Sequence, residues 1–307
     1  MPDFYELVAF RDSAAEAVGR AEIDGLLREQ ISGTTLFVSL RRFTAVQFRR
    51  KMQRGLNRPF LVMGAPQDGG QRCPLVVKSR AGYADRPEAM LKELFALLLA
   101  RELGLKVPEP VMVEIPEGLD WAASDFPKHA ELIRQSIGWN VGTIHLGDGW
   151  KPWNTGIAPR SIPVETLETA YAFDAMVENP DREAANPNLL WRGDELAVLD
   201  FDKAFRFLRI GEKDARPWRS MLLRLNLERH CLHSHLPERK EGEILGICLW
   251  NAFEEWCLGR SSAELSAAIV EGFPDPNLDL KRIEGYLTKL ATDPENFFRY
   301  LTDASRL

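Results

Sequence analysis

The chain has 307 residues, of which 45% are hydrophobic and 27% charged, and its formal net charge is -6 at pH 7. This composition is typical of a soluble globular protein, and the length allows one large domain or two smaller ones. The negative charge argues against direct nucleic-acid binding over the whole surface. No apolar run approaches the ~20 residues that a membrane-spanning helix needs. The four cysteines show no CxxC spacing, so we expect free thiols and a cytoplasmic location.

The N-terminal region is the least informative part of the chain. Residues 14–31 have helical spacing and predict that residues 1–33 form a helical extension. Residues 34–40 are rich in β-branched and apolar side chains, which predicts a strand. The basic stretch 43–53 is expected to be a turn or a helix, with its charges on a solvated face.

A hairpin is predicted by two apolar runs, residues 60–63 and 74–78, which flank a glycine-rich turn. Lys78 ends the second run. A lone lysine at the end of a strand is usually a surface residue, so only its context can indicate a role in binding phosphates.

A strong helix is predicted over residues 88–103, because a proline stands near its start and Gly104 follows its end. Its apolar positions cover a wide face, so we expect substantial burial. Glu93 lies in the first turns, fifteen residues after Lys78, and suits an ion pair that would orient the lysine. Glu102, at the far end of the helix, is the competing candidate.

Two further strands and a short helix complete the first half. Residues 107–115 and 139–146 predict strands, the second of them an edge strand, and residues 129–137 predict a helix. The second strand runs into a glycine-rich linker.

The second half of the chain is predicted to be mostly helical. Residues 164–176 form an amphipathic helix. His230, Cys231, His233 and His235 do not share one helix face, so we interpret them as packing and surface residues and not as a zinc site. The other expected helices are residues 218–235, 241–258, 262–273, 278–291 and 294–304.

Asp181, Asn186 and Asp200 form the most informative constellation. A turn at residues 192–195, between two apolar runs, predicts a hairpin that folds Asn186 and Asp200 toward each other, with Asp181 on the loop leading in. Asn and Asp are common turn residues, and each motif alone is more often only that. Together they supply what phosphoryl transfer needs: a carboxylate to orient a hydroxyl, and two oxygen donors to hold Mg²⁺. Asn188 is the alternative to Asn186, which the five-residue spacing favours.

Two segments give the chain a resemblance to the HipA-like kinases, bacterial relatives of protein kinases and phosphatidylinositol kinases. They are Lys92-Glu-Leu…Glu102-Leu-Gly-Leu-Lys-Val-Pro-Glu-Pro and Asn179-Pro-Asp-Arg…Asn186-Pro-Asn-Leu-Leu…Leu199-Asp-Phe-Asp. The resemblance implies Asp181 as the catalytic aspartate, Asn186 and Asp200 as metal ligands, Lys78 as the catalytic phosphate-binding lysine, and Glu93 as its partner.

The resemblance also implies a fold: α+β and two-lobed, with a small antiparallel-sheet N-lobe that contains one long helix. Residues 34–146 would form this N-lobe, and residues 147–307 a larger, mostly helical C-lobe. It implies ATP and Mg²⁺ as cofactors and a hydroxyl acceptor, with protein Ser/Thr favoured. In such a two-lobed kinase the adenine edge pairs with backbone groups where the strand 139–146 meets its glycine-rich linker, which makes Ile144 and Leu146 candidates for nucleotide binding.

Three departures from the kinase pattern stand out. Asn179-Pro180 precedes Asp181 where many kinases have His-Arg, and Asp202 replaces the glycine of Asp-Phe-Gly. Gly55 is the one glycine of the expected phosphate-binding loop. The alternatives are therefore a nucleotide-binding pseudokinase or a toxin–antitoxin-type protein that acts through a protein partner, and more weakly a small-molecule kinase.

Overall fold

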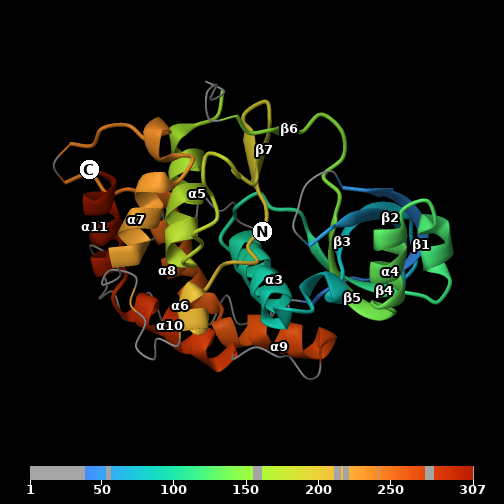
Figure 1. Cartoon of the computed structure of the whole chain (residues 1–307). Coiled ribbons are helices and arrows are strands. Elements are labelled where there is room, and N and C mark those ends of the chain that lie inside the picture. The colour runs from blue at the N-terminus through green and yellow to red at the C-terminus, as the bar shows by residue number, and fades with distance from the viewer. Residues whose placement is uncertain are drawn as a thin grey trace.

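The structure is a computed structural model, and it describes residues 39–52, 57–154, 161–210, 216, 221–240, 242–273 and 280–306. The expected N-terminal extension, most of the expected strand 34–40, and Gly55 lie outside these residues. The fold is mixed α+β, with a β-barrel at one end and a group of helices at the other (Figure 1). Within the described ranges, no helix is long and apolar enough to cross a membrane.

Five strands form a closed barrel in the order β1-β2-β3-β5-β4. Neighbouring strands pair antiparallel, except that β1 pairs parallel with β4 and thereby closes the barrel. The expected antiparallel sheet is therefore a barrel with one parallel pair. The strands are β1 (Arg42–Lys51), β2 (Phe60–Pro66), β3 (Cys73–Lys78), β4 (Pro110–Ile115) and β5 (Gly138–Ile144).

Strand β1 shows that the expected turn or helix over residues 43–53 was wrong. Phe43, Ala45 and Phe48 are buried in the barrel interior, as strand side chains on one face should be. One register shift follows Ala45 and another follows Phe48. These irregularities interrupt the two-residue alternation, so the pattern in the sequence does not look like a strand.

Strand β5 is not the expected edge strand, because it pairs with β3 on one side and β4 on the other. A closed barrel has no free edge. At Gly142, a Cβ atom would lie 2.7 Å from Val113 Cγ2 and 3.0 Å from the Val76 carbonyl oxygen. The glycine is thus required by the close approach of three strands.

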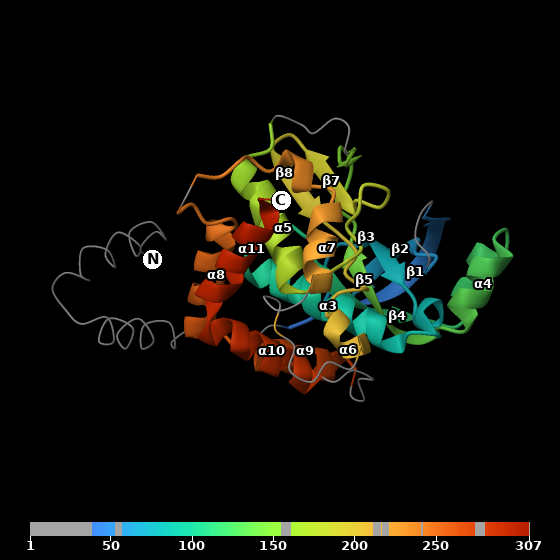
Figure 2. The ribbon, with the colours of Figure 1, turned by 60° about the vertical axis from the view of Figure 1, so that its left-hand side comes forward.

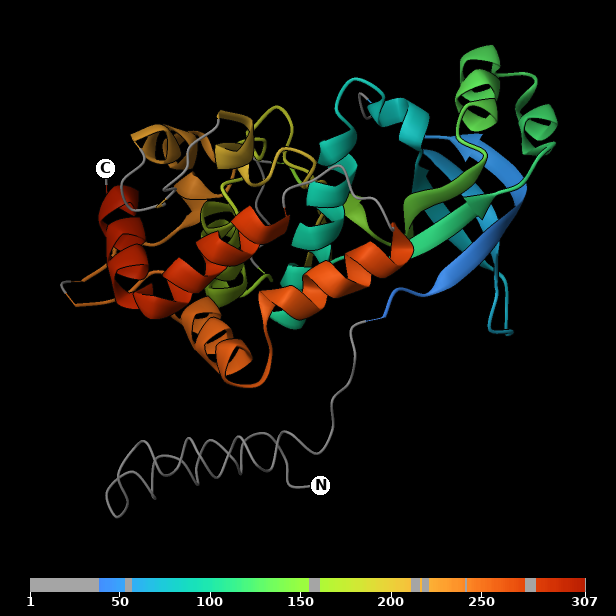
Figure 3. The ribbon, with the colours of Figure 1, turned by 90° about the horizontal axis from the view of Figure 1, so that it is seen from below.

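Helix α3 (Pro87–Glu102) connects the barrel to the helices, and its prediction is confirmed. Every residue from Ala89 to Ala100 is buried. The helix contacts both β4 and α9 (Ser262–Gly272), and its apolar side chains belong to the hydrophobic core of the helical end. Figure 3 shows α9 beside α3 with one end against the barrel, where Gly272 packs closely on Met112.

The helical end is built around α5 (Val164–Met176), which matches its predicted bounds and packs against α7 and α8 (Figure 2). Helix α8 begins six residues later than expected, because Gly246 before it has a φ of 75° and packs closely on α5 at Ala172. The remaining helical elements are η1 (Arg80–Tyr83), η2 (Leu119–Ala123), α4 (Pro127–Arg134), α6 (Arg206–Ile210), α7 (Met221–Arg229), η4 (His233–His235), α8 (Ile247–Gly259), α10 (Leu280–Thr292) and α11 (Pro294–Ser305).

A second, three-stranded sheet contains the predicted hairpin. Its order is β6-β7-β8, and β7 pairs antiparallel with β8 around Gly193, whose φ is 63°. Beyond the paired strands, the Leu199 amide donates to the Asn188 carbonyl oxygen at 2.9 Å. The hairpin therefore places the loop before β7 next to the segment that contains Asp200. The strands are β6 (Lys151–Pro152), β7 (Leu189–Arg192) and β8 (Glu195–Val198).

Candidate functional site

Lys78 joins three segments that lie far apart in the sequence. Its Nζ lies 2.5 Å from Glu93 Oε1 and 2.7 Å from Asp200 Oδ1. The lysine ends β3, the glutamate comes from α3, and the aspartate follows β8. The competing Glu102 pairs with Arg260 at 3.7 Å and is not the partner of the lysine.

The two carboxylates that share the Lys78 ammonium group differ in burial, because the Glu93 side chain is 4% exposed and that of Asp200 is 28% exposed. Burial acts to lower the pKa of Lys78, but Asp200 and Glu93 outweigh it and hold that pKa well above its usual value. Burial acts to raise the pKa of Asp200, but Lys78 keeps it below its ordinary value. Burial raises the pKa of Glu93 to about 7, against the opposing effect of Lys78. Glu93 is therefore the carboxylate whose charge is least stabilised.

Tyr83 fixes the other oxygen of Glu93. Its hydroxyl donates a hydrogen bond to Glu93 Oε2 at 2.9 Å, and both groups are buried. Tyr83 lies in η1, the short helix between β3 and α3. Nothing in the local sequence distinguishes this tyrosine, so its role depends on a contact that only the fold reveals.

Asp181 and Asn186, predicted from their spacing, lie side by side. Asn186 Nδ2 donates to Asp181 Oδ2 at 3.1 Å, and the Asp181 amide donates to Asn179 Oδ1 at 3.3 Å. The other carboxylate oxygen, Asp181 Oδ1, pairs with Lys203 Nζ. The sequence reasoning missed Lys203, which directly follows the Asp-Phe-Asp motif.

Arg182 is fully buried and holds the Asp181 loop against the Asp200 segment. Its Nη2 donates to Asp174 Oδ1 at 3.1 Å, and its Nε also pairs with this carboxylate. Its Nη1 donates to the carbonyl oxygens of Pro187, Asn188 and Leu199 at 3.1, 2.8 and 3.0 Å. One side chain thus fixes both arms of the hairpin, immediately before Asp200.

The carboxylate of Asp174, on α5, accepts the hydrogen bonds of Arg182 and of two further side chains. Asn179 Nδ2 donates to its Oδ1 at 2.7 Å, and His230 Nε2 lies 3.0 Å from its Oδ2. Burial acts to raise the pKa of Asp174, but Arg182 and His230 keep it below its ordinary value. His230 is thus a buried packing residue with a polar partner, in line with its predicted role.

Asn188, the alternative to Asn186, differs from it in environment. Its Nδ2 is buried without a hydrogen-bond partner, whereas Asn186 is exposed. Its φ is 48° and that of Asp200 is 60°, so both residues adopt left-handed backbone that non-glycine residues rarely occupy. Such conformations cost energy and are common at functional sites.

The residues predicted to bind adenine lie at the exit of β5. The Ile144 amide donates to the Glu109 carbonyl and the His145 amide to the Pro74 carbonyl, each at 2.9 Å. These two N–H groups are engaged within the barrel and cannot donate to a base. Leu146 comes next and is half-buried.

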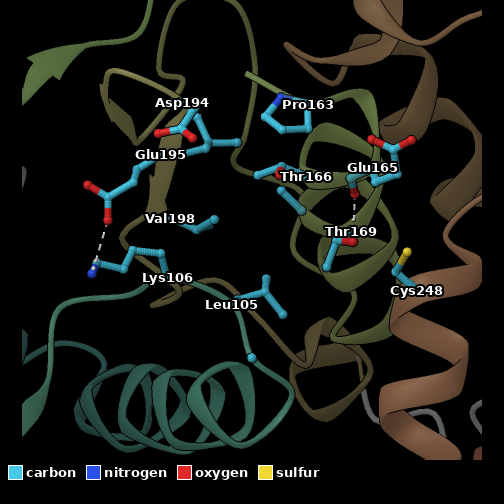
Figure 4. Close-up of a pocket in the computed structure, with 13 residues that line it drawn as sticks. Leu105, Lys106, Pro163, Glu165, Thr166, Thr169, Asp194, Glu195, Val198 and Cys248 are labelled. Atoms are coloured by element: carbon cyan, nitrogen blue, oxygen red, sulfur yellow. Dashed lines mark hydrogen bonds and ion pairs between the residues drawn. The ribbon is translucent and has the colours of Figure 1, made fainter. Parts of the chain in front are cut away.

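A separate cavity of about 440 Å³ lies between the β7–β8 hairpin, α5 and the loop after α3 (Figure 4). In it Lys106 pairs with Glu195 at 3.3 Å, and the Thr169 hydroxyl donates to the Glu165 carbonyl at 2.7 Å. None of the predicted site residues lines it, so this cavity is distinct from the cluster around Lys78.

Comparison with known proteins identifies a family. A family model described as HipA-like kinase matches residues 45–209, which is more than half of the chain. Among solved structures, the crystal structure of a Helicobacter pylori proinflammatory kinase, CtkA, aligns with a TM-score of 0.47 and 9% sequence identity. The alignment covers 87% of this chain and 98% of that one. No curated protein matches the chain.

Proposed function

Because the chain belongs to the HipA-like kinase family, we propose that it transfers the γ-phosphate of ATP·Mg²⁺ to a hydroxyl group, with a protein serine or threonine as the acceptor. The observation that carries the proposal is the bridge from Lys78 to Glu93 and Asp200. A lysine oriented by a helix glutamate, next to a metal-binding aspartate, is the arrangement that protein kinases use to bind ATP phosphates.

The oxygen donors in this region suit Mg²⁺, which prefers carboxylate and amide oxygens. Asp200 would supply the carboxylate, and Asn186 or Asn188 the amide oxygen. The five-residue spacing from Asp181 favours Asn186, while the hydrogen bond from the Leu199 amide to the Asn188 carbonyl, next to Asp200, favours Asn188. When bound, the ion would neutralise charge on the transferring phosphoryl group.

In the proposed reaction, Asp181 orients the acceptor hydroxyl. A bond forms from the acceptor oxygen to the γ-phosphorus while the bond from that phosphorus to the β,γ-bridging oxygen breaks, and ADP leaves. The hydroxyl proton passes to Asp181. Lys78 stabilises negative charge on the phosphates, and the backbone at Leu146, with the Ile144 side chain and Gly55, is proposed to contact the nucleotide.

The proposed domain organisation follows from the proposed kinase function. Residues 34–146 would form the N-lobe and residues 147–307 the C-lobe, with ATP between them and residues 1–33 as an extension available to a protein partner. The barrel interior has a hydrophobic core of its own, which supports a distinct N-lobe, whereas α3, within residues 34–146, packs its apolar side chains into the core of the helices. A cytoplasmic location belongs to the same proposal.

A nucleotide-binding pseudokinase is the second candidate, and one observation favours it. Both carboxylate oxygens of Asp181 are already bonded, one to Lys203 and the other to Asn186. An acceptor hydroxyl would have to replace one of these contacts. A protein that binds ATP without transferring phosphate would keep both of them.

Measuring ATP binding and phosphoryl transfer separately tests the proposal. Asp181→Asn should lower the transfer of labelled γ-phosphate, to the protein itself or to a panel of protein acceptors, by about 100-fold or more. Its affinity for ATP·Mg²⁺ should stay within about 3-fold of wild type, whereas Asp200→Ala should lose Mg²⁺-dependent binding. Asp194→Asn, in the exposed hairpin turn, is the charge-matched control. Full activity of Asp181→Asn would contradict the proposed role of that residue. If the wild-type protein binds ATP·Mg²⁺ but transfers no phosphate, it is a pseudokinase.

A further inference from the structure

Three buried or half-buried polar side chains meet next to the Asp200 segment. Asn57 Nδ2 donates to Asp202 Oδ2 at 3.0 Å. Arg86 Nη2 donates to Asn57 Oδ1 at 3.3 Å and lies 3.5 Å from Asp202 Oδ2. Asn57 and Asp202 are only 8% and 6% exposed, so these two side chains are shielded from water, whereas the Arg86 side chain is 36% exposed. A buried carboxylate is held there by a neutral donor and a cation together.

The cluster connects three segments that each carry a residue of the proposed site. Asn57 belongs to the connection between β1 and β2, whose base is closed by a hydrogen bond from the Met52 amide to the Pro59 carbonyl at 2.9 Å. Arg86 immediately precedes α3, which carries Glu93. Asp202 follows Asp200 by two residues. A shift of any of the three side chains would therefore act on the other two segments.

A close backbone contact independently fixes Asn57 at the same place. A Cβ atom on Gly82, in η1, would lie 2.6 Å from the Asn57 carbonyl oxygen. Real Cβ atoms do not approach a backbone oxygen so closely, so η1 can pack on Asn57 only because residue 82 is glycine. Asn57 is thus held by packing against Gly82 on one side and by Asp202 on the other.

This arrangement accounts for the departure from the kinase pattern at position 202, which the proposed function leaves unexplained. The connection between β1 and β2 contains a single glycine, Gly55, where kinases have a glycine-rich loop over the phosphates. Asp202 stands where kinases have the glycine of Asp-Phe-Gly. A side chain at position 202 can bond to the β1–β2 connection, whereas glycine cannot.

We propose that Asp202 is a positioning residue: it holds Asn57, which precedes β2, and Arg86, which precedes α3, against the Asp200 segment and thereby sets the affinity for the nucleotide phosphates. This inference rests on the proposed function. Asp202 itself need not touch the nucleotide or the acceptor. Its loss should therefore weaken ATP·Mg²⁺ binding more than it slows phosphoryl transfer at saturating ATP.

Exchanging the two interacting side chains tests the proposal. Asn57→Asp sets two carboxylates against each other at a buried position and should weaken ATP·Mg²⁺ binding about 10-fold or more, the order expected for a lost charged hydrogen bond. Asp202→Asn removes the charge that faces Arg86 and should weaken binding about 3-fold. The double variant Asn57→Asp/Asp202→Asn restores one amide and one carboxylate, so its affinity should return to within about 3-fold of wild type.

Calorimetric titration with ATP·Mg²⁺ gives the affinities, and steady-state kinetics separates kcat from KM. Asp85→Asn, at an exposed position, is the control and should bind ATP·Mg²⁺ like wild type. The proposal is overturned if the double variant binds as weakly as Asn57→Asp, if both single variants bind like wild type, or if the loss falls on kcat alone. If Asn57→Asp does not fold, a double variant that folds and binds supports the pairing, and one that does not contradicts it. Wild-type protein that fails to bind ATP·Mg²⁺ would instead refute the proposed function, and this inference with it.

Discussion

The buried arginine behind the Asp181 loop gives the sharpest test of how the site is held together. Arg182→Met would leave the Asp174 carboxylate, with a side chain only 1% exposed, without its cationic partner. It would also remove the donor from the carbonyl oxygens of Pro187, Asn188 and Leu199. Removing one partner of a buried ion pair costs about 3–5 kcal/mol, which is a large share of the ~5–15 kcal/mol that stabilises a typical domain.

Urea unfolding measures this cost. We expect Arg182→Met to lower the free energy of unfolding by about 3–5 kcal/mol. Asp174→Asn combined with Arg182→Met should cost less than the sum of the two single changes, by about 2 kcal/mol, because the double variant leaves no unpaired charge. Arg192→Met is the matched control, since Arg192 pairs with Glu195 in an exposed position, and it should cost under about 1 kcal/mol. A loss below about 1 kcal/mol for Arg182→Met, or strict additivity, would refute the reasoning.

Three further predictions concern stability. The pKa of Glu93 is raised from its ordinary 4.5 to about 7 in the folded protein, so between these pH values the folded state binds a proton that the unfolded state has lost. The stability gained from protonated Glu93 is therefore complete below pH 4.5 and is lost as the pH rises through 7. The unfolding free energy of wild type minus that of Glu93→Gln should therefore fall by up to about 3 kcal/mol between pH 4.5 and pH 7. Urea titrations that give the same difference at every pH would contradict this prediction. Tyr83→Phe leaves a buried oxygen of Glu93 unpaired and should cost about 1–3 kcal/mol in the same assay, with an unchanged midpoint as the contrary result. Gly142→Ala should lower the free energy of unfolding by about 1–3 kcal/mol, because its Cβ would lie 2.7 Å from Val113. Gly285→Ala, on an open face of α10, is the control and should be neutral or stabilising. Equal thermal midpoints for the two variants would contradict this prediction.

Local patterns were enough to predict much of the fold. The strands β2 and β3, the helices α3 and α5, and the β7–β8 hairpin follow from apolar periodicity and from glycine and proline at their ends. The first strand was missed because its bulges interrupt the alternation. The closure of the barrel by β1 and β4 was missed because parallel pairing between strands distant in sequence leaves no local signal.

The candidate site divides in the same way. Spacing and residue type were enough to select Lys78, Glu93 and Asp200, which the fold brings into contact, although their roles stay a prediction. The network around Arg182 and the cluster around Asp202 could not be inferred, because each depends on side chains that meet only after folding. Asp202 was visible in the sequence as an unusual residue, but its partner at position 57 was not.

A crystal structure with a non-hydrolysable ATP analogue and Mg²⁺ tests the central claim most directly. We expect the phosphates to contact Lys78 Nζ and the cation to bind Asp200 together with Asn186 or Asn188, which would also decide between the two asparagines. A nucleotide bound in the cavity of Figure 4, or phosphates away from Lys78 and Asp200, would contradict the proposed site.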